Sequence, residues 1–83
     1  MMLKIKESIN LAELEKFDYD DFGVCYKKYG GLGEQYFINK RTREITRIHP
    51  YSFREIPTED EIFDLVQAGL IEKVDDKEWK PII

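Results

Sequence analysis

The pattern of hydrophobic and polar positions predicts five strands. The run Leu3–Lys6 alternates apolar with polar residues, as a half-buried strand does. Two later runs are rich in aromatic and β-branched residues, which fit a pleated sheet. Proline ends a further run at Pro50, because it cannot donate to a strand ladder. The predicted strands cover residues 3–6, 24–29, 35–39, 44–49 and 70–74.

Short turns join the three middle strands into an antiparallel meander. Three glycines within residues 30–33 favour a loop, because glycine tolerates backbone angles that other residues avoid. Asn39 opens residues 40–43 as a tight turn, since its side chain can bond the backbone of the following residues. The sequence therefore predicts two hairpins between residues 24 and 49.

A first helix is predicted over residues 10–17. Asn10 can cap the free amides of the first turn, and Glu13 can bond back to the amide of Asn10. Ile9 and Leu14 have the spacing of a hydrophobic staple. We expect this helix to end near Phe17, where a loop rich in aspartate begins.

The strongest helix signal follows Pro57. Thr58 is placed as the N-cap and Glu61 completes a capping box. Apolar residues then recur at helical spacing, and Gly69 is placed to stop the helix.

These elements predict an α+β domain with the order β-α-β-β-β-α-β, built on a central three-stranded antiparallel meander with two helices. We expect residues 1–74 to form the single domain, with the last strand paired to the first. Residues 75–83 are expected to form a partly loose tail, anchored by Trp79.

Composition limits what the chain can be. Its 83 residues, 42% of them hydrophobic and 36% charged, suit one small globular domain rather than a two-domain enzyme. A single cysteine, Cys25, excludes a disulfide scaffold. No apolar run approaches the roughly 18 residues of a membrane span. The N-terminus lacks the pattern of a signal peptide, so we expect a cytoplasmic protein without a membrane partner.

Charge is divided unevenly along the chain. Residues 1–25 carry a net charge of −3, residues 26–54 carry +5, and residues 55–83 carry −6. The simplest interpretation is that basic and acidic surfaces of one small domain compensate each other. The alternative is that one of them meets a partner of opposite charge.

No residue pattern predicts an enzyme, a cofactor or a metal site. Cys25 and His49 are each single, and nothing in the sequence makes them neighbours, as a nucleophile pair requires. One histidine and one cysteine cannot form a structural zinc site of the usual composition. The glycines of residues 30–33 lead into a strand, so they are not a phosphate loop.

Both ends of the chain resemble a group of small uncharacterised proteins of phages, prophages and mobile elements in Gram-positive bacteria. The similarity covers residues 4–17 and residues 62–74. It implies a cytoplasmic, phage-like accessory protein, and it transfers no functional residue.

We therefore expect a non-enzymatic module that acts by binding another protein. Tyrosine and arginine are frequent at the centres of protein interfaces. The candidate partner-binding residues are Tyr29, Arg41, Arg43, Arg47 and Tyr51. On this hypothesis, exchange of the three arginines for glutamate abolishes partner binding without unfolding the domain.

The alternative is a nucleic-acid-binding module. Residues 26–54 interleave basic with aromatic side chains, which could neutralise phosphates and stack on bases. An overall pI of about 5.0 disfavours this alternative, because nucleic-acid-binding domains are usually basic.

Overall fold

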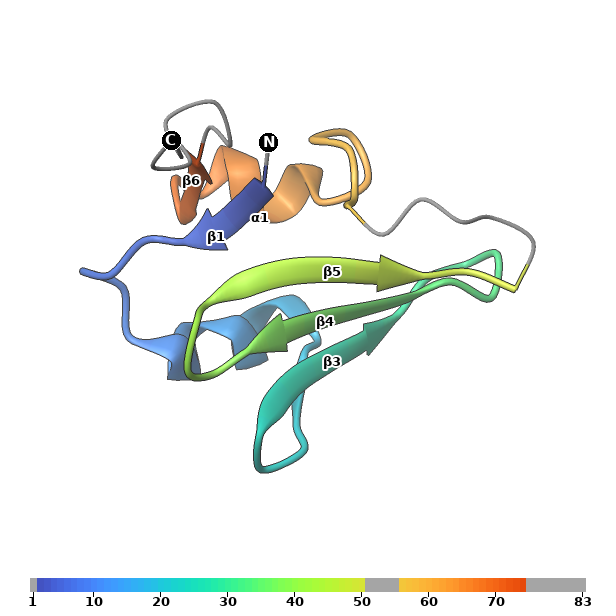
Figure 1. Cartoon of the computed structure of the whole chain (residues 1–83), viewed down its shortest axis with the longest axis horizontal. Helices are drawn as coiled ribbons and strands as arrows, with labels where there is room; N and C mark the ends of the chain where they lie inside the picture. Colours follow the sequence, from blue (N-terminus) through green and yellow to red (C-terminus); the bar gives the residue numbers. More distant parts are fainter. Residues whose placement is uncertain (1, 51–55, 75–83) are drawn as a thin grey trace, which may run out of the picture.

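The protein is an α+β domain with one six-stranded sheet (Figure 1). The structure, a computed structural model, describes residues 2–50 and 56–74. Its elements are β1 (Met2–Ile5), the 3₁₀ helix η1 (Leu11–Phe17), β2 (Asp20–Asp21), β3 (Cys25–Tyr29), β4 (Gln35–Asn39), β5 (Glu44–Ile48), α1 (Phe63–Gln67) and β6 (Ile71–Val74).

The strand order across the sheet is β2-β3-β4-β5-β1-β6, and all five pairings are antiparallel. Strands β2 to β5 form a meander. Strand β1 lies between β5 and β6, which therefore run parallel to each other. Helix α1 lies in the connection that leads from β5 past β1 to β6. The predicted pairing of the first strand with the last is confirmed, with Leu3 opposite Lys73.

Both helices pack on the same face of the sheet, and in Figure 1 they pass behind it. The buried side chains from this face and from the helical layer form a single hydrophobic cluster. Its fully buried members are Leu3, Ile5, Leu14, Ile38, Ile45, Ile62 and Leu65. The described residues therefore form two layers, and one face of their sheet lies outside this core.

The five predicted strands and the two predicted hairpins are present. Strand β4 has the predicted bounds, β1 is shifted by one residue at both ends, and the other three differ by one residue at one end. Asn39 acts as predicted, because its Oδ1 accepts hydrogen bonds from the amides of Arg41 and Thr42 at 2.8 and 3.0 Å.

The first helix differs from the prediction in kind. Asn10 caps it by accepting a hydrogen bond from the amide of Ala12 at 2.9 Å, but the helix is 3₁₀ rather than α. The carboxylate of Glu13 forms an ion pair with Lys16 at 2.9 Å. Asp18 ends the helix in the left-handed conformation, at a φ of 68°.

The second helix is shorter than predicted. The capping box is formed, since Glu61 accepts from the amide of Thr58 and its own amide donates to Oγ1 of Thr58. The α-helix nevertheless begins only at Phe63, after a non-helical Ile62. Glu61 also pairs with Arg47 of the sheet, and this tertiary contact competes with regular helical geometry. Gly69 takes the predicted left-handed conformation, at a φ of +77°.

One strand was not predicted. Asp20 and Asp21 were expected in a loop, but they form β2 and pair with Lys27 and Tyr26 of β3. Aspartate is rare in strands, so its local preference gives no signal for this pairing. Two aspartates at the edge of a sheet also oppose pairing with another strand.

The predicted tail, residues 75–83 with Trp79, lies outside the described residues, as does Tyr51. No helix among residues 2–50 and 56–74 is long and apolar enough to cross a membrane.

Candidate functional site: the open face of the sheet

Side chains of the meander alternate between the core and an open face of the sheet. In β4, Tyr36 and Ile38 are buried while Gln35, Phe37 and Asn39 point the other way. In β5, Ile45 and Arg47 are buried, whereas Thr46 and Ile48 are exposed. No helix of the described residues covers this second face, which we call the open face.

A group of large side chains gathers on the open face. Strand register places Tyr29, Gln35 and Ile48 in one row, and Lys27 and Phe37 in the next. Phe22 joins them from the turn before β3, with its ring near Lys27. We call Phe22, Lys27, Tyr29, Phe37 and Ile48 the aromatic patch.

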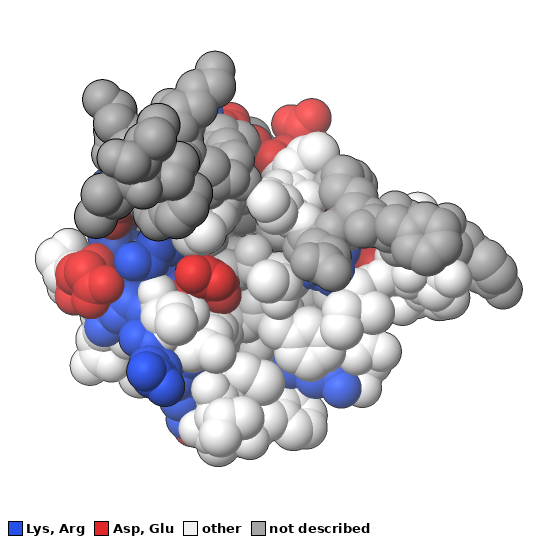
Figure 2. Space-filling view, viewed as in Figure 1, with Lys and Arg blue, Asp and Glu red and all other residues white. Residues whose placement is uncertain are grey.

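The aromatic patch is accessible to a partner. Phe22, Tyr29 and Ile48 are exposed by 54%, 61% and 57%. Figure 2 shows this face: its lower part is mostly neutral, with some basic atoms at the lower right, and a band of charged side chains lies to the left. A contiguous exposed apolar patch with a polar rim is typical of an interaction surface.

Lys27 lies at the centre of the patch. Its Nζ is 4.8 Å from the ring centroid of Tyr29, 5.3 Å from that of Phe22 and 5.5 Å from that of Phe37. All three distances lie within the range of cation–π attraction, about 6 Å. The ammonium of Lys27 is therefore close enough to be attracted by all three rings.

The turn between β2 and β3 positions Phe22. Gly23 has a φ of +87°, which a side chain would oppose, and its amide donates to Oδ1 of Asp21 at 2.8 Å. The amide of Phe22 donates to the carbonyl of Cys25 at 2.9 Å. These bonds close the turn and bring the ring of Phe22 over β3.

Two of the predicted partner-binding residues are exposed, at opposite ends of the meander. Tyr29 belongs to the aromatic patch. Arg41 is exposed in the turn between β4 and β5, where its amide donates to Asn39. Strand β4 separates the two positions, so a single small contact would not include both.

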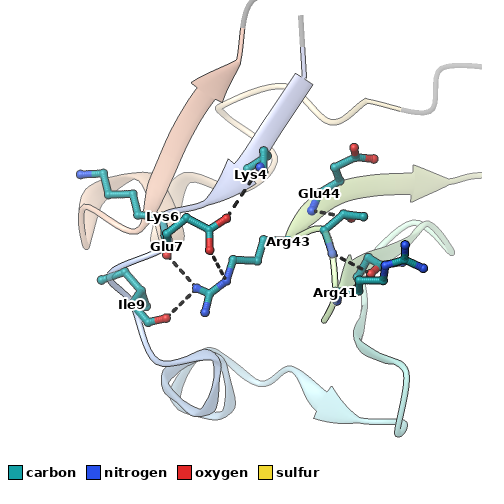
Figure 3. Close-up of polar contacts among 9 residues, drawn as sticks. Lys4, Lys6, Glu7, Ile9, Arg41, Arg43 and Glu44 are labelled. Atoms are coloured by element: carbon teal, nitrogen blue, oxygen red, sulfur yellow. Dashed lines mark hydrogen bonds and ion pairs between the residues drawn. The ribbon is translucent and has the colours of Figure 1, made fainter.

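Arg43 makes contacts within the domain (Figure 3). Its Nη1 donates to the carbonyls of Lys6 and Ile9 at 2.7 and 2.6 Å, and its Nε lies 3.4 Å from Oε2 of Glu7. The guanidinium thereby fastens the connection between β1 and η1 to the sheet.

Arg47 lies on the covered face and is only 7% exposed. Its Nε is 2.8 Å from Oε2 of Glu61, which also accepts a hydrogen bond from the hydroxyl of Tyr36 at 3.4 Å. Burial, followed by the charge of Glu61, raises the pKa of Tyr36. This cluster joins the sheet to the segment before α1.

The described basic side chains of residues 26–54, which we call the basic meander, therefore pair largely with carboxylates of their own chain. Lys28 pairs with Asp64 at 3.1 Å and Lys40 with Asp21 at 2.6 Å. The hydrogen bond from Lys40 lowers the pKa of Asp21. Together with the contacts of the two arginines, these pairs favour the interpretation that opposite charges compensate within one domain.

These contacts change the result expected when Arg41, Arg43 and Arg47 are exchanged for glutamate. Replacing Arg43 and Arg47 with glutamate would bring carboxylates against Glu7 and Glu61. Because the second pair is buried, we expect such a variant to unfold rather than to lose partner binding alone.

The described residues contain no catalytic pair of cysteine and histidine. Cys25 lies opposite Asn39, whereas His49 follows Ile48, which lies opposite Gln35. Gln35 and Asn39 are four residue steps apart along β4, a distance of about 13 Å. Within residues 2–50 and 56–74, no three acidic, histidine or cysteine side chains are grouped to hold a metal ion.

Sequence reasoning did not assign Phe22, Lys27, Phe37 or Ile48 to a protein-binding surface. Strand alternation places Phe37 opposite in direction to Tyr36, but it does not show which of the two faces the helices cover. No sequence signal placed Phe22 on this face, because its position depends on the turn after β2, a strand that was not predicted.

Comparisons with known proteins give no indication of the function of this chain. The chain matches no protein-family model, no curated protein and no solved structure. The resemblance of its two ends to small phage proteins stays an expectation.

Proposed function

We propose that this chain is a small non-enzymatic accessory protein that binds another protein through the open face of its sheet. The aromatic patch carries the proposal, because it exposes the rings of Phe22 and Tyr29 and the side chain of Ile48 on a face that the helical layer does not cover. The resemblance of the chain ends to phage proteins suggests a partner in the cytoplasm of a Gram-positive bacterium.

The residue types of the patch support protein binding. Aromatic side chains bury much apolar area and dominate the energy of many interfaces. Strands β3, β4 and β5 hold Tyr29, Phe37 and Ile48 in a fixed arrangement, so little conformational entropy is lost when a partner binds.

Nucleic-acid binding by residues 26–54 is the weaker alternative. Four basic side chains of this segment form ion pairs with the chain's own carboxylates: Lys28, Lys40, Arg43 and Arg47. A carboxylate beside a cation reduces its capacity to neutralise a phosphate. Among the described residues of the segment, only Lys27 and Arg41 form no such pair.

Capture from a Gram-positive cell lysate tests the proposal. The tagged wild-type protein is compared with a double variant, Tyr29→Ser with Ile48→Ser, which removes two exposed side chains of the patch. We expect the double variant to stay folded and to capture about tenfold less of a stoichiometric protein partner.

Phe63→Ser is the matched control, because Phe63 is 55% exposed but lies on α1. It is expected to capture as much partner as the wild type. Equal capture by a folded double variant would contradict the proposal. Captured nucleic acid that disappears with nuclease, and that weakens steeply with salt, would favour the alternative.

A further inference from the structure

The aromatic patch surrounds a positive charge without a carboxylate partner. Among the described residues, no carboxylate oxygen forms an ion pair with Nζ of Lys27. Asp20 lies opposite Lys27 in the register of β2 and β3, yet the two side chains are not paired. The ammonium is instead surrounded by three rings.

A partner that covers the patch must compensate this charge. Water around Lys27 is displaced when the exposed rings are covered, and a buried cation without a partner is costly. Cation–π contacts offset only part of that cost. A carboxylate placed above Lys27 would supply the missing charge.

We propose that the partner is an acidic peptide segment that places a carboxylate over Lys27 and apolar side chains on the neighbouring rings. This inference rests on the proposed function, because it names the chemistry of the partner for the same face. The apolar contacts fall on Phe22, Tyr29 and Ile48, which are all more than half exposed, and Tyr29 and Ile48 share one row of the sheet.

A second copy of the chain fits this face poorly. A symmetric dimer formed through the patch centres brings one Lys27 against the Lys27 of the other copy. Two ammonium groups in a desolvated contact repel each other. The patch therefore favours a partner of opposite charge over self-association.

Peptide titration followed by NMR tests the inference. The probe is acetyl-Leu-Asp-Phe-Asp-Leu-amide, and the matched control peptide has asparagine in place of both aspartates. We expect the acidic peptide to shift the backbone amide signals of β3 and β4 around the patch, and to bind about tenfold more tightly than the control peptide.

Two lysine variants separate the role of Lys27 from a general charge effect. Lys27→Met keeps a long apolar side chain against the rings, and we expect it to bind both peptides equally. Lys4→Met is the control, because Lys4, on β1, also lies on the open face of the sheet but outside the aromatic patch. It is expected to retain the preference for the acidic peptide.

Several results would overturn the inference. Equal binding of the two peptides by the wild type, or no shift at millimolar acidic peptide, would contradict the carboxylate contact while the lysate capture still tests the proposed function. Tighter binding of a thymidine oligonucleotide than of the acidic peptide would favour nucleic acid. Shifts that depend only on protein concentration would indicate self-association.

Discussion

Arg41 and Arg43 show how two similar residues in one turn can have different roles. The side chain of Arg43 bonds two carbonyls and pairs with Glu7, whereas Arg41 is exposed. We expect Arg43→Ala to lower the unfolding free energy by about 2 kcal/mol, because charged hydrogen bonds are lost. Urea denaturation measures this change.

The control for that variant is Arg41→Ala, which should change the unfolding free energy by no more than about 0.5 kcal/mol. Equal stability of the two variants would show that the contacts of Arg43 contribute nothing beyond a surface side chain.

The buried Tyr19 should make the domain less stable in alkali. Burial, then the charges of Asp64 and Tyr36, raises the pKa of Tyr19 above its ordinary value near 10. Above about pH 10 the unfolded chain therefore loses this proton while the folded chain keeps it. The unfolding free energy should fall with rising pH, by up to about 1.4 kcal/mol per pH unit for this group.

Tyr19→Phe keeps the buried ring but removes the titrating hydroxyl. We expect the variant to show a smaller loss of stability between pH 10 and pH 11.5, measured by urea denaturation at each pH. Tyr29→Phe is the control, because that ring is exposed to solvent in the folded domain. An identical alkaline loss in all three proteins would contradict the role of Tyr19.

At the scale of elements, the loop between β3 and β4 depends on one of its glycines. A Cβ added at Gly30 would overlap Oε1 of Glu34 and would lie 2.7 Å from its Cγ. The side chain of Glu34 is buried and accepts a hydrogen bond from the amide of Leu32. Gly30→Ala must therefore displace Glu34, and we expect a loss of about 1–2 kcal/mol.

Gly31→Ala provides the comparison, because a Cβ at Gly31 meets no atom within 4 Å. Its effect on thermal unfolding should be small, within about 0.5 kcal/mol. If both alanine variants unfold at the wild-type temperature, Glu34 does not constrain the loop.

The sequence predicted those elements whose signals are local. Strand β4 follows from its residue types, and the turn after it follows from Asn39, because each depends on neighbours in the chain. Strand β2 lacks a local signal, because aspartate is rare in strands. The late start of α1 depends on a contact between Glu61 and Arg47, which lies far away in the sequence. Such tertiary contacts override local preference.

At the scale of the whole molecule, the sequence indicated the uneven distribution of charge, but it did not show that the opposite charges pair within the domain. The basic meander suggested a binding surface, yet four of its cations pair with acidic segments on either side in the chain. The candidate site could be predicted only at Tyr29. The remaining patch residues become visible once the helices are known to cover one face of the sheet.

Site-specific photo-crosslinking tests the central claim most directly. A benzoylphenylalanine residue replaces Thr46, which is exposed on the open face in the row of Lys27 and Phe37. In a second protein it replaces Gln67, which is exposed on α1. Both proteins are irradiated in the same Gram-positive lysate.

The account predicts a discrete crosslinked protein from position 46 and none from position 67. Crosslinking from position 67 alone would contradict it, because the partner would then contact the helical layer. The absence of any crosslinked protein from position 46, in a lysate where the tagged protein captures its partner, would equally contradict binding by the open face.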